Sequence, residues 1–234
     1  SQKPGTLSGV ENFTLDFAQS TGSYDASTAT TAAYTVTNAA DNYHIDIDNL
    51  ATGSTVKITA NADSIDLDYA DDATAAITFD DAGGGADGLN HDETVNVTDA
   101  QTVNITVTGG QEHLITGAIT LDATDTDYLT ITADGTSSDL HMDGALASAK
   151  VQTVSLISTD GGIIDFDSTG LAAASELTSF TASTTGGADA ADITLGSFAV
   201  GNNAAAAKLT SIDLDASHGG DITTGSFVAT GASL

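Results

Sequence analysis

Short segments in which apolar and polar residues alternate recur along the chain, and this alternation restricts the fold more than any other feature. Clear examples are His44–Asp48 (HIDID), Thr55–Thr59 (TVKIT) and Ser64–Asp68 (SIDLD). A period of two with β-branched residues is the signal of a β-strand. The segments recur at intervals of about 8–12 residues, which is typical of an all-β protein. We therefore predict an all-β chain.

Two motifs in the second half of the chain repeat at related distances. Residues 149–156 (AKVQTVSL) resemble residues 207–214 (AKLTSIDL), 58 positions later, with a related copy beginning at Leu177. Residues 192–198 (DITLGSF) recur as residues 221–227 (DITTGSF), 29 positions later. A repeat of 20–50 residues is typical of a solenoid, in which each coil buries its inward residues against its neighbours.

The expected fold is therefore a parallel β-solenoid, or β-helix, with coils of about 29 residues and three short strands each. The alternative is a β-sandwich, especially in the first half, where no clean repeat is visible. We assign residues 1–140 to an irregular all-β portion, either solenoid or small sandwich, and residues 141–234 to the repeat-containing solenoid. As an alternative, the two portions form one continuous domain. The Ala-rich segments 171–177 and 203–208 are expected to form corners, being too short for independent helices.

Charge excludes several classes of function. The net charge is −29, with four Lys and no Arg. Nucleic-acid binding requires cations that neutralise phosphates, and anionic membranes attract the same residues, so neither partner is expected. No apolar run approaches the ~20 residues of a membrane span, so we expect no membrane insertion. The chain contains no Cys, which excludes disulfides and thiolate metal sites.

The acidic residues are 29 Asp and only 4 Glu. Glu favours helices, whereas Asp favours turns and provides the short oxygen ligand that calcium sites use. The ratio therefore indicates turns together with Ca²⁺ binding. A salt-adapted acidic surface is the alternative explanation.

Gly-Asp clusters are the candidate calcium sites, because Gly permits backbone conformations that turn carbonyl groups toward a metal. Three clusters occur, at residues 80–92, 186–192 and 218–221. The alternative for each is a solvated turn without metal. The candidate ligands are Asp80, Asp81, Asp87, Asp92, Asp189, Asp192 and Asp221.

Other Asp residues occur in pairs along strands, at 46/48, 66/68, 165/167 and 213/215. Residues i and i+2 of a strand point to the same face, so each pair presents two carboxylates together. We expect most of these to solubilise the surface. Paired carboxylates also occur in glycosidases, but this chain has no Arg and no Trp to bind sugars. We predict no catalytic or organic-cofactor site. The five scattered His residues are expected at the surface or at strand edges.

The chain resembles bacterial S-layer proteins of the RTX-related kind. The resemblance is carried by residues 9–15 (GVENFTL), the Leu-Thr-Ser starts at 177 and 209, residues 214–217 (LDAS) and the Ala/Thr/Gly/Asp background. It implies a secreted, extracellular, calcium-loaded β-solenoid that assembles with itself on the cell surface. An adhesin or extracellular filament module, with a cell-surface glycan as partner, is the alternative function. A polysaccharide-active β-helix enzyme is the second alternative.

Overall fold

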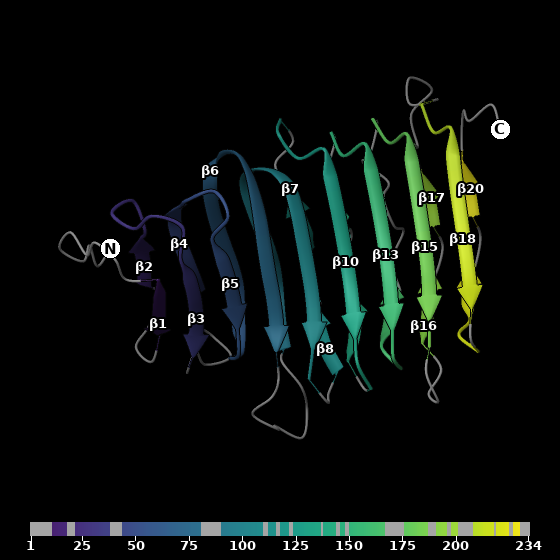
Figure 1. The fold of residues 1–234 in the computed structure, drawn as a ribbon, viewed down its shortest axis with the longest axis horizontal. Helices are drawn as coiled ribbons and strands as arrows, with labels where there is room; N and C mark the ends of the chain where they lie inside the picture. Colours follow the sequence, from purple (N-terminus) through teal and green to yellow (C-terminus); the bar gives the residue numbers. More distant parts are fainter. Residues whose placement is uncertain are drawn as a thin grey trace.

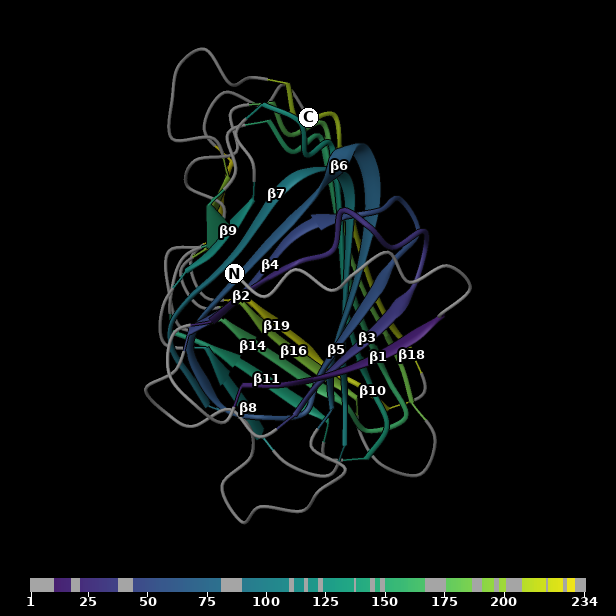
Figure 2. The same cartoon turned by 90° about the vertical axis from the view of Figure 1, so that its left-hand side faces the viewer.

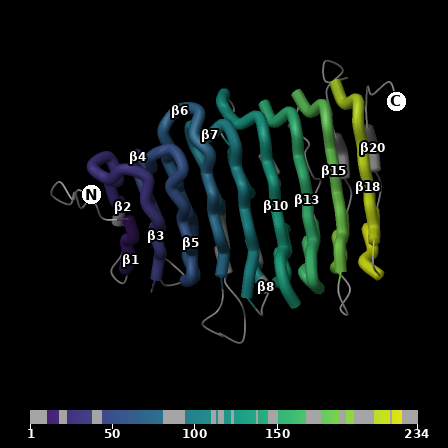
Figure 3. The backbone as a smooth tube through the Cα atoms, in the orientation of Figure 1, coloured from purple at the N-terminus to yellow at the C-terminus, as the bar shows by residue number. Residues whose placement is uncertain are grey.

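The structure is a computed structural model that shows a parallel β-solenoid, with coil following coil along one axis (Figures 1 and 3). All strand pairs in the described residues are parallel, and these residues contain no helix. No helix long and apolar enough to cross a membrane occurs in the described parts. The all-β, solenoid prediction is confirmed. The described residues are 11–17, 22–37, 44–80, 90–109, 112–115, 118–121, 124–136, 138–143, 146–147, 150–166, 176–186, 191–195, 198–200, 208–217, 219–224 and 227–229.

The longest ladder, which we call face A, runs the length of the molecule. Between its first and last described strands, each strand pairs with the strand one coil before it and the strand one coil after it. Its members are β1 (Asn12–Asp16), β3 (Ala33–Thr37), β5 (Thr55–Ile58), the second half of β6 (Ala62–Asp80), the second half of β7 (Asn90–Thr108), β10 (Tyr128–Asp134), β13 (Thr153–Thr159), β15 (Ser179–Thr185) and β18 (Ser211–Ser217).

Two further ladders complete the coils (Figure 2). Face B begins at the first residues of β7 and continues through β8 (Glu112–Ile115), β11 (Asp139–Met142), β14 (Ile163–Phe166), β16 (Asp192–Leu195) and β19 (Ile222–Thr224). Face C comprises β2 (Gly22–Asp25), β4 (His44–Leu50), the first halves of β6 and β7, β9 (Ile119–Leu121) and β12 (Leu146–Ala147). β17 (Phe198–Val200) pairs separately with β20 (Phe227–Ala229).

The repeats detected in the sequence correspond to coils in register. Ile193 pairs with Ile222 and Phe198 with Phe227, so the short motif stacks on its own copy in the next coil. The longer echo covers two coils, because Val154 pairs with Phe180 and Phe180 pairs with Ile212. These two steps differ in length. The hydrogen bonds that join Thr178 to Gln152 and Thr210 to Thr178 span 26 and 32 positions, so individual coils are shorter or longer than the predicted length of about 29 residues.

The coils at the N-terminal end belong to the same parallel stack, and they are shorter. Phe13 pairs with Tyr34, and Tyr34 pairs with Val56. Hydrogen bonds between consecutive coils in this part join residues 20–24 positions apart. Coils lengthen where β8 adds the third face. In the sequence this short repeat shows only as the recurrence of His44–Asp48 in Ser64–Asp68, because such a coil carries little more than two strands.

The ladder on face B crosses the expected boundary between residues 140 and 141. β11 spans this point and pairs with both β8 and β14. The chain on either side of the boundary therefore belongs to the same stack of coils.

The core consists of stacked columns of inward side chains. Ile105, Ile131 and Leu156 follow one another on face A, each at most 1% exposed. Alternation thus places apolar residues inside at every coil, with Tyr34, Phe79 and Phe180 among the aliphatic side chains. His113 departs from the expectation of surface histidines: it is fully buried beside Leu140, and its Nε2 lies 3.0 Å from the Thr108 carbonyl oxygen.

Aspartates also form corners, as their turn preference predicts. Asp72, Asp99 and Asp160 have positive φ angles of 58°, 59° and 51°. Asn and Asp tolerate this left-handed conformation better than other residues with a side chain. The corners expected at 171–177 and 203–208 lie mostly outside the described residues.

Candidate functional site

The first predicted calcium cluster, residues 80–92, is only partly described. Asp80 ends β6, is 8% exposed and forms an ion pair with the Lys57 ammonium group. Asp92 lies within β7, and its side chain is outside the described parts. Asp81 and Asp87 also lie outside the described residues. Asp80 therefore has a structural partner on the neighbouring strand β5.

The other two clusters meet in space. The backbone N–H of Asp221 donates a 3.0 Å hydrogen bond to Asp192 Oδ1 across consecutive coils. Asp189 lies outside the described residues. Within the described part of the chain, no group of three or more His, Cys, Asp or Glu side chains is positioned to hold a metal ion.

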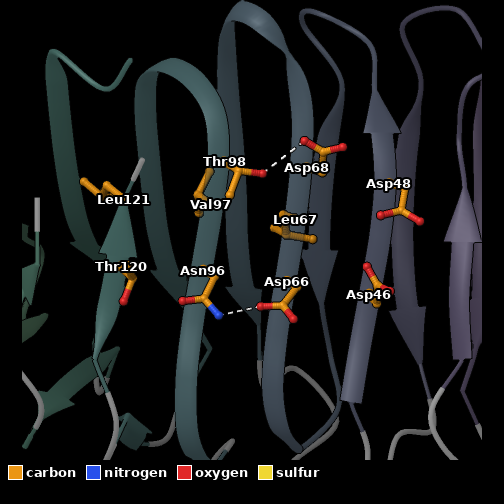
Figure 4. A pocket seen from close by; sticks show the side chains of 10 residues that line it. All are labelled: Asp46, Asp48, Asp66, Leu67, Asp68, Asn96, Val97, Thr98, Thr120 and Leu121. Atoms are coloured by element: carbon orange, nitrogen blue, oxygen red, sulfur yellow. Dashed lines mark hydrogen bonds between the residues drawn. The ribbon is translucent and has the colours of Figure 1, made fainter. Parts of the chain in front are cut away.

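A larger concentration of carboxylates lies on the outer surface of face C. There a groove of about 490 Å³ crosses β4, β6, β7 and β9 (Figure 4). We call it the acidic groove. Parallel register places Asp46, Asp66, Asn96 and Thr120 in one row across these strands, with Asp48, Asp68 and Thr98 two positions further along. Its lining residues are Asp46, Asp48, Asp66, Leu67, Asp68, Asn96, Val97, Thr98, Thr120 and Leu121.

Neutral and basic side chains relieve part of the repulsion among these carboxylates. Asn96 Nδ2 donates to Asp66 Oδ1 at 2.5 Å, and His44 Nε2 lies 2.8 Å from Asp66 Oδ2. Thr98 donates to Asp68 Oδ1 at 3.0 Å. Figure 4 shows both the Asn96 and the Thr98 contacts bridging β7 to β6. Asp66 and Asp68 are thereby oriented toward β7.

Asp46 is the electrostatically strained member of the groove. Partial burial raises its pKa, and the neighbouring carboxylates of Asp48 and Asp66 raise it further, against the opposing effect of His44. A hydrogen bond with Asp48 also favours the protonated form. Asp46 therefore holds a proton more readily than an isolated carboxyl group.

We expect Asp46→Asn to raise the free energy of unfolding at neutral pH by roughly 0.2–1 kcal/mol, the scale of a cross-strand pair. A raised folded-state pKa means that stability falls as pH rises from the ordinary Asp value through the folded value. The gain should thus be largest above that window and disappear below it. Urea unfolding at several pH values measures this. Asp213→Asn removes the same charge beside neutral Thr181 and serves as the control.

Sequence reasoning identified the 46/48 and 66/68 pairs but did not bring them together. The available signal was the repeat of His44–Asp48 as Ser64–Asp68, which the structure places one coil apart in register. The other pairs are less concentrated. Asp165 lies 3.6 Å from His141 Nδ1, Asp167 is outside the described residues, and Asp213 and Asp215 are exposed on β18.

The fold and the groove together define a parallel β-solenoid with an acidic lateral face. Comparison with protein-family models, curated proteins and solved structures finds no match.

Proposed function

We propose that this chain is a structural, self-assembling protein of the extracellular cell surface, an S-layer subunit or a part of one, stabilised by Ca²⁺. The observation that carries the proposal is the repeating scaffold itself. Parallel coils stack along one axis, and consecutive coils are joined by strand pairing. An array of this kind is suited to a structural role.

Charge supports the calcium component of the proposal. Two of the four Lys residues already have acidic partners, since Lys57 contacts Asp80 and Lys208 contacts Glu176. Copies of a chain with a net charge of −29 repel one another when they pack. Divalent cations from the extracellular medium would neutralise such contacts, and hard carboxylate oxygens are the ligands that Ca²⁺ prefers.

A thermal melt with Ca²⁺ against EGTA, read together with light scattering, tests the proposal. Ca²⁺ should raise the melting temperature, because an ion that binds only the folded state stabilises it by about 2.7 kcal/mol at one hundred times its Kd. It should also promote large particles. NaCl at matched ionic strength is the control for simple screening. Equal effects of NaCl and Ca²⁺ would contradict a specific calcium role.

Paired variants locate the binding. Asp66→Asn/Asp68→Asn alters the acidic groove, and Asp192→Asn/Asp221→Asn alters the contact between two predicted clusters while keeping a hydrogen-bond acceptor at residue 192. Loss of the calcium shift in the second variant alone supports the sites predicted at the Gly-rich corners. Loss of the calcium shift in the Asp66→Asn/Asp68→Asn variant alone would instead indicate that calcium binds at the acidic groove.

An adhesin is the second candidate, and the acidic groove favours it. Asp66, Asn96 and Thr120 present oxygen and amide groups that hydrogen-bond sugar hydroxyls. Saturable binding to a glycan array, abolished by Asn96→Ala, would support this function. Self-association without glycan binding would favour the surface-assembly function.

A further inference from the structure

The outer surface of face A carries an area without charged side chains. It spans five consecutive strands, namely the second halves of β6 and β7 followed by β10, β13 and β15, which lie side by side along the molecule (Figure 1). The outward residues are the first, third and fifth of segments 74–78, 102–106, 128–132, 153–157 and 179–183, and they are Thr, Ser, Asn, Ala, Tyr or Ile. We call this area the neutral patch.

Outward positions on the other two faces carry carboxylates. Asp46 and Asp66 lie on neighbouring strands of face C, and Asp139 and Asp165 lie on neighbouring strands of face B. Copies of a chain with a net charge of −29 repel one another least where the local charge is lowest. At physiological ionic strength the Debye length is ~8 Å, so charges beyond the rim of a contact are largely screened. The neutral patch is therefore the part of the described surface where two copies approach at the lowest electrostatic cost.

Two apolar side chains stand out among the hydroxyl groups of the neutral patch. Tyr128 is 47% exposed, although it lies between Thr102 and Thr153. Ile157 is partly exposed. Contacts between proteins are depleted of charge at their centre and enriched in Tyr, which often contributes a large share of the binding energy. Both features of such a centre are present here.

The positions of Tyr128 and Ile157 suit a contact of the chain with itself. They lie on the neighbouring strands β10 and β13, on opposite sides of the Thr130–Ser155 pair near the middle of the patch. Strand spacing and rise separate them by about 14 Å, so they do not touch within one chain. In a two-fold contact each residue pair occurs twice with the roles exchanged. Two copies that meet face to face about the middle of the patch therefore bring Tyr128 of each over Ile157 of the other.

We propose that the neutral patch binds the neutral patch of a second copy of this chain, in a two-fold contact that pairs Tyr128 with Ile157. This inference rests on the proposed self-assembly and specifies one of its contacts. Five strands at ~4.8 Å and three outward positions at ~6.7 Å give about 500 Å² per copy. The total of about 1,000 Å² is at the lower limit for a specific interface, so the contact is weak and reversible.

The response to ions distinguishes this contact from one that Ca²⁺ bridges. The neutral patch presents no carboxylate for Ca²⁺ to bind, so the chain should dimerise in EGTA. Salt should strengthen the dimer, because the remaining electrostatic force between the copies is repulsion. Sedimentation over a range of protein concentrations, in EGTA at about 0.1 M and about 1 M NaCl, measures this, since the Debye length falls from ~10 Å to ~3 Å. The dissociation constant should fall severalfold.

Substitutions test the pairing of Tyr128 with Ile157. Tyr128→Ala and Ile157→Glu should each raise the dissociation constant about tenfold, because each change occurs twice in the dimer. Tyr128→Lys/Ile157→Glu should associate about threefold more tightly than Ile157→Glu alone, since the ammonium group at position 128 then faces the carboxylate at position 157 of the other copy. Thr223→Glu adds the same charge on face B, beside neutral Thr194, and should match the wild type. Circular dichroism checks the fold of each variant.

The possible failures are distinguishable. Assembly that requires Ca²⁺ and does not respond to Tyr128→Ala or Ile157→Glu overturns the inference and leaves the proposed function standing. A double variant that associates no more tightly than Ile157→Glu overturns the pairing of Tyr128 with Ile157. Monomers that bind a glycan array and lose this binding on Tyr128→Ala overturn the inference in favour of a glycan partner. A wild type that remains monomeric in EGTA and in Ca²⁺, without glycan binding, overturns both the inference and the proposed function.

Discussion

Replacing Leu156 with Ala is expected to lower the free energy of unfolding by about 3 kcal/mol. Leu156 lies at the centre of β13, 1% exposed, between Ile131 of the preceding coil and Ala182 of the following coil. Truncation removes its apolar contacts and leaves a cavity that two rigid neighbouring coils cannot close. Urea unfolding followed by circular dichroism measures the loss.

Leu214→Ala is the matched control, because Leu214 occupies the same column two coils later and is 44% exposed. Truncation there should cost less than about 1 kcal/mol, since much of the side chain already contacts water. The comparison is made at a protein concentration where the chain is monomeric. Equal losses at the two positions would contradict the exposure of Leu214.

Gly162→Ala is expected to destabilise the protein by a similar amount, about 3 kcal/mol, for a different reason. A Cβ atom at Gly162 would lie 2.4 Å from the carbonyl oxygen of Ala133 in the preceding coil. Backbone atoms cannot move aside as a flexible side chain can. Substitution must therefore push apart two coils that the ladder holds together. Urea unfolding measures the loss.

The corner at residues 219–220 separates this steric effect from backbone strain. Gly219 has a φ of 90°, but a Cβ atom added there would meet no atom within 4 Å. Gly219→Ala should therefore cost about 1 kcal/mol of strain alone. A Cβ at Gly220 would lie 2.2 Å from the Ala191 carbonyl oxygen, so Gly220→Ala should cost more than Gly219→Ala. The reverse order would show that backbone conformation, and not close approach, selects these glycines.

Gly220 belongs to the third predicted calcium cluster, at residues 218–221. Residues 218–221 contain a Gly-Gly-Asp motif that predicts a metal site, yet Gly220 has a packing role that requires no metal. If the cost of Gly220→Ala is the same in Ca²⁺ and in EGTA, the motif acts through packing. A cost that appears only with Ca²⁺ would support the predicted site.

The sequence predicted the carboxylate pairs of the candidate site one strand at a time, but not their assembly into one groove. The alternation in His44–Asp48 and Ser64–Asp68 correctly places two carboxylates of each strand on one outer face. Composition could not show which strands are neighbours, and therefore assigned these residues only to solubility. Register supplies that information, because Asp46 pairs with Asp66 and Asp66 with Asn96. The acidic groove is a product of stacking.

The sequence by itself determined the all-β class, the solenoid and the coil-to-coil match of residues 192–198 with residues 221–227. These follow from the alternation within each strand and from the repeat along the chain, both of which can be read without knowing which strands are neighbours. Only the tertiary structure decided the coil lengths, the shortness of the N-terminal coils, the burial of His113 and the exposure of Leu214. Each depends on which residues of other coils lie above and below, and that neighbourhood is set by the stacking of the whole chain.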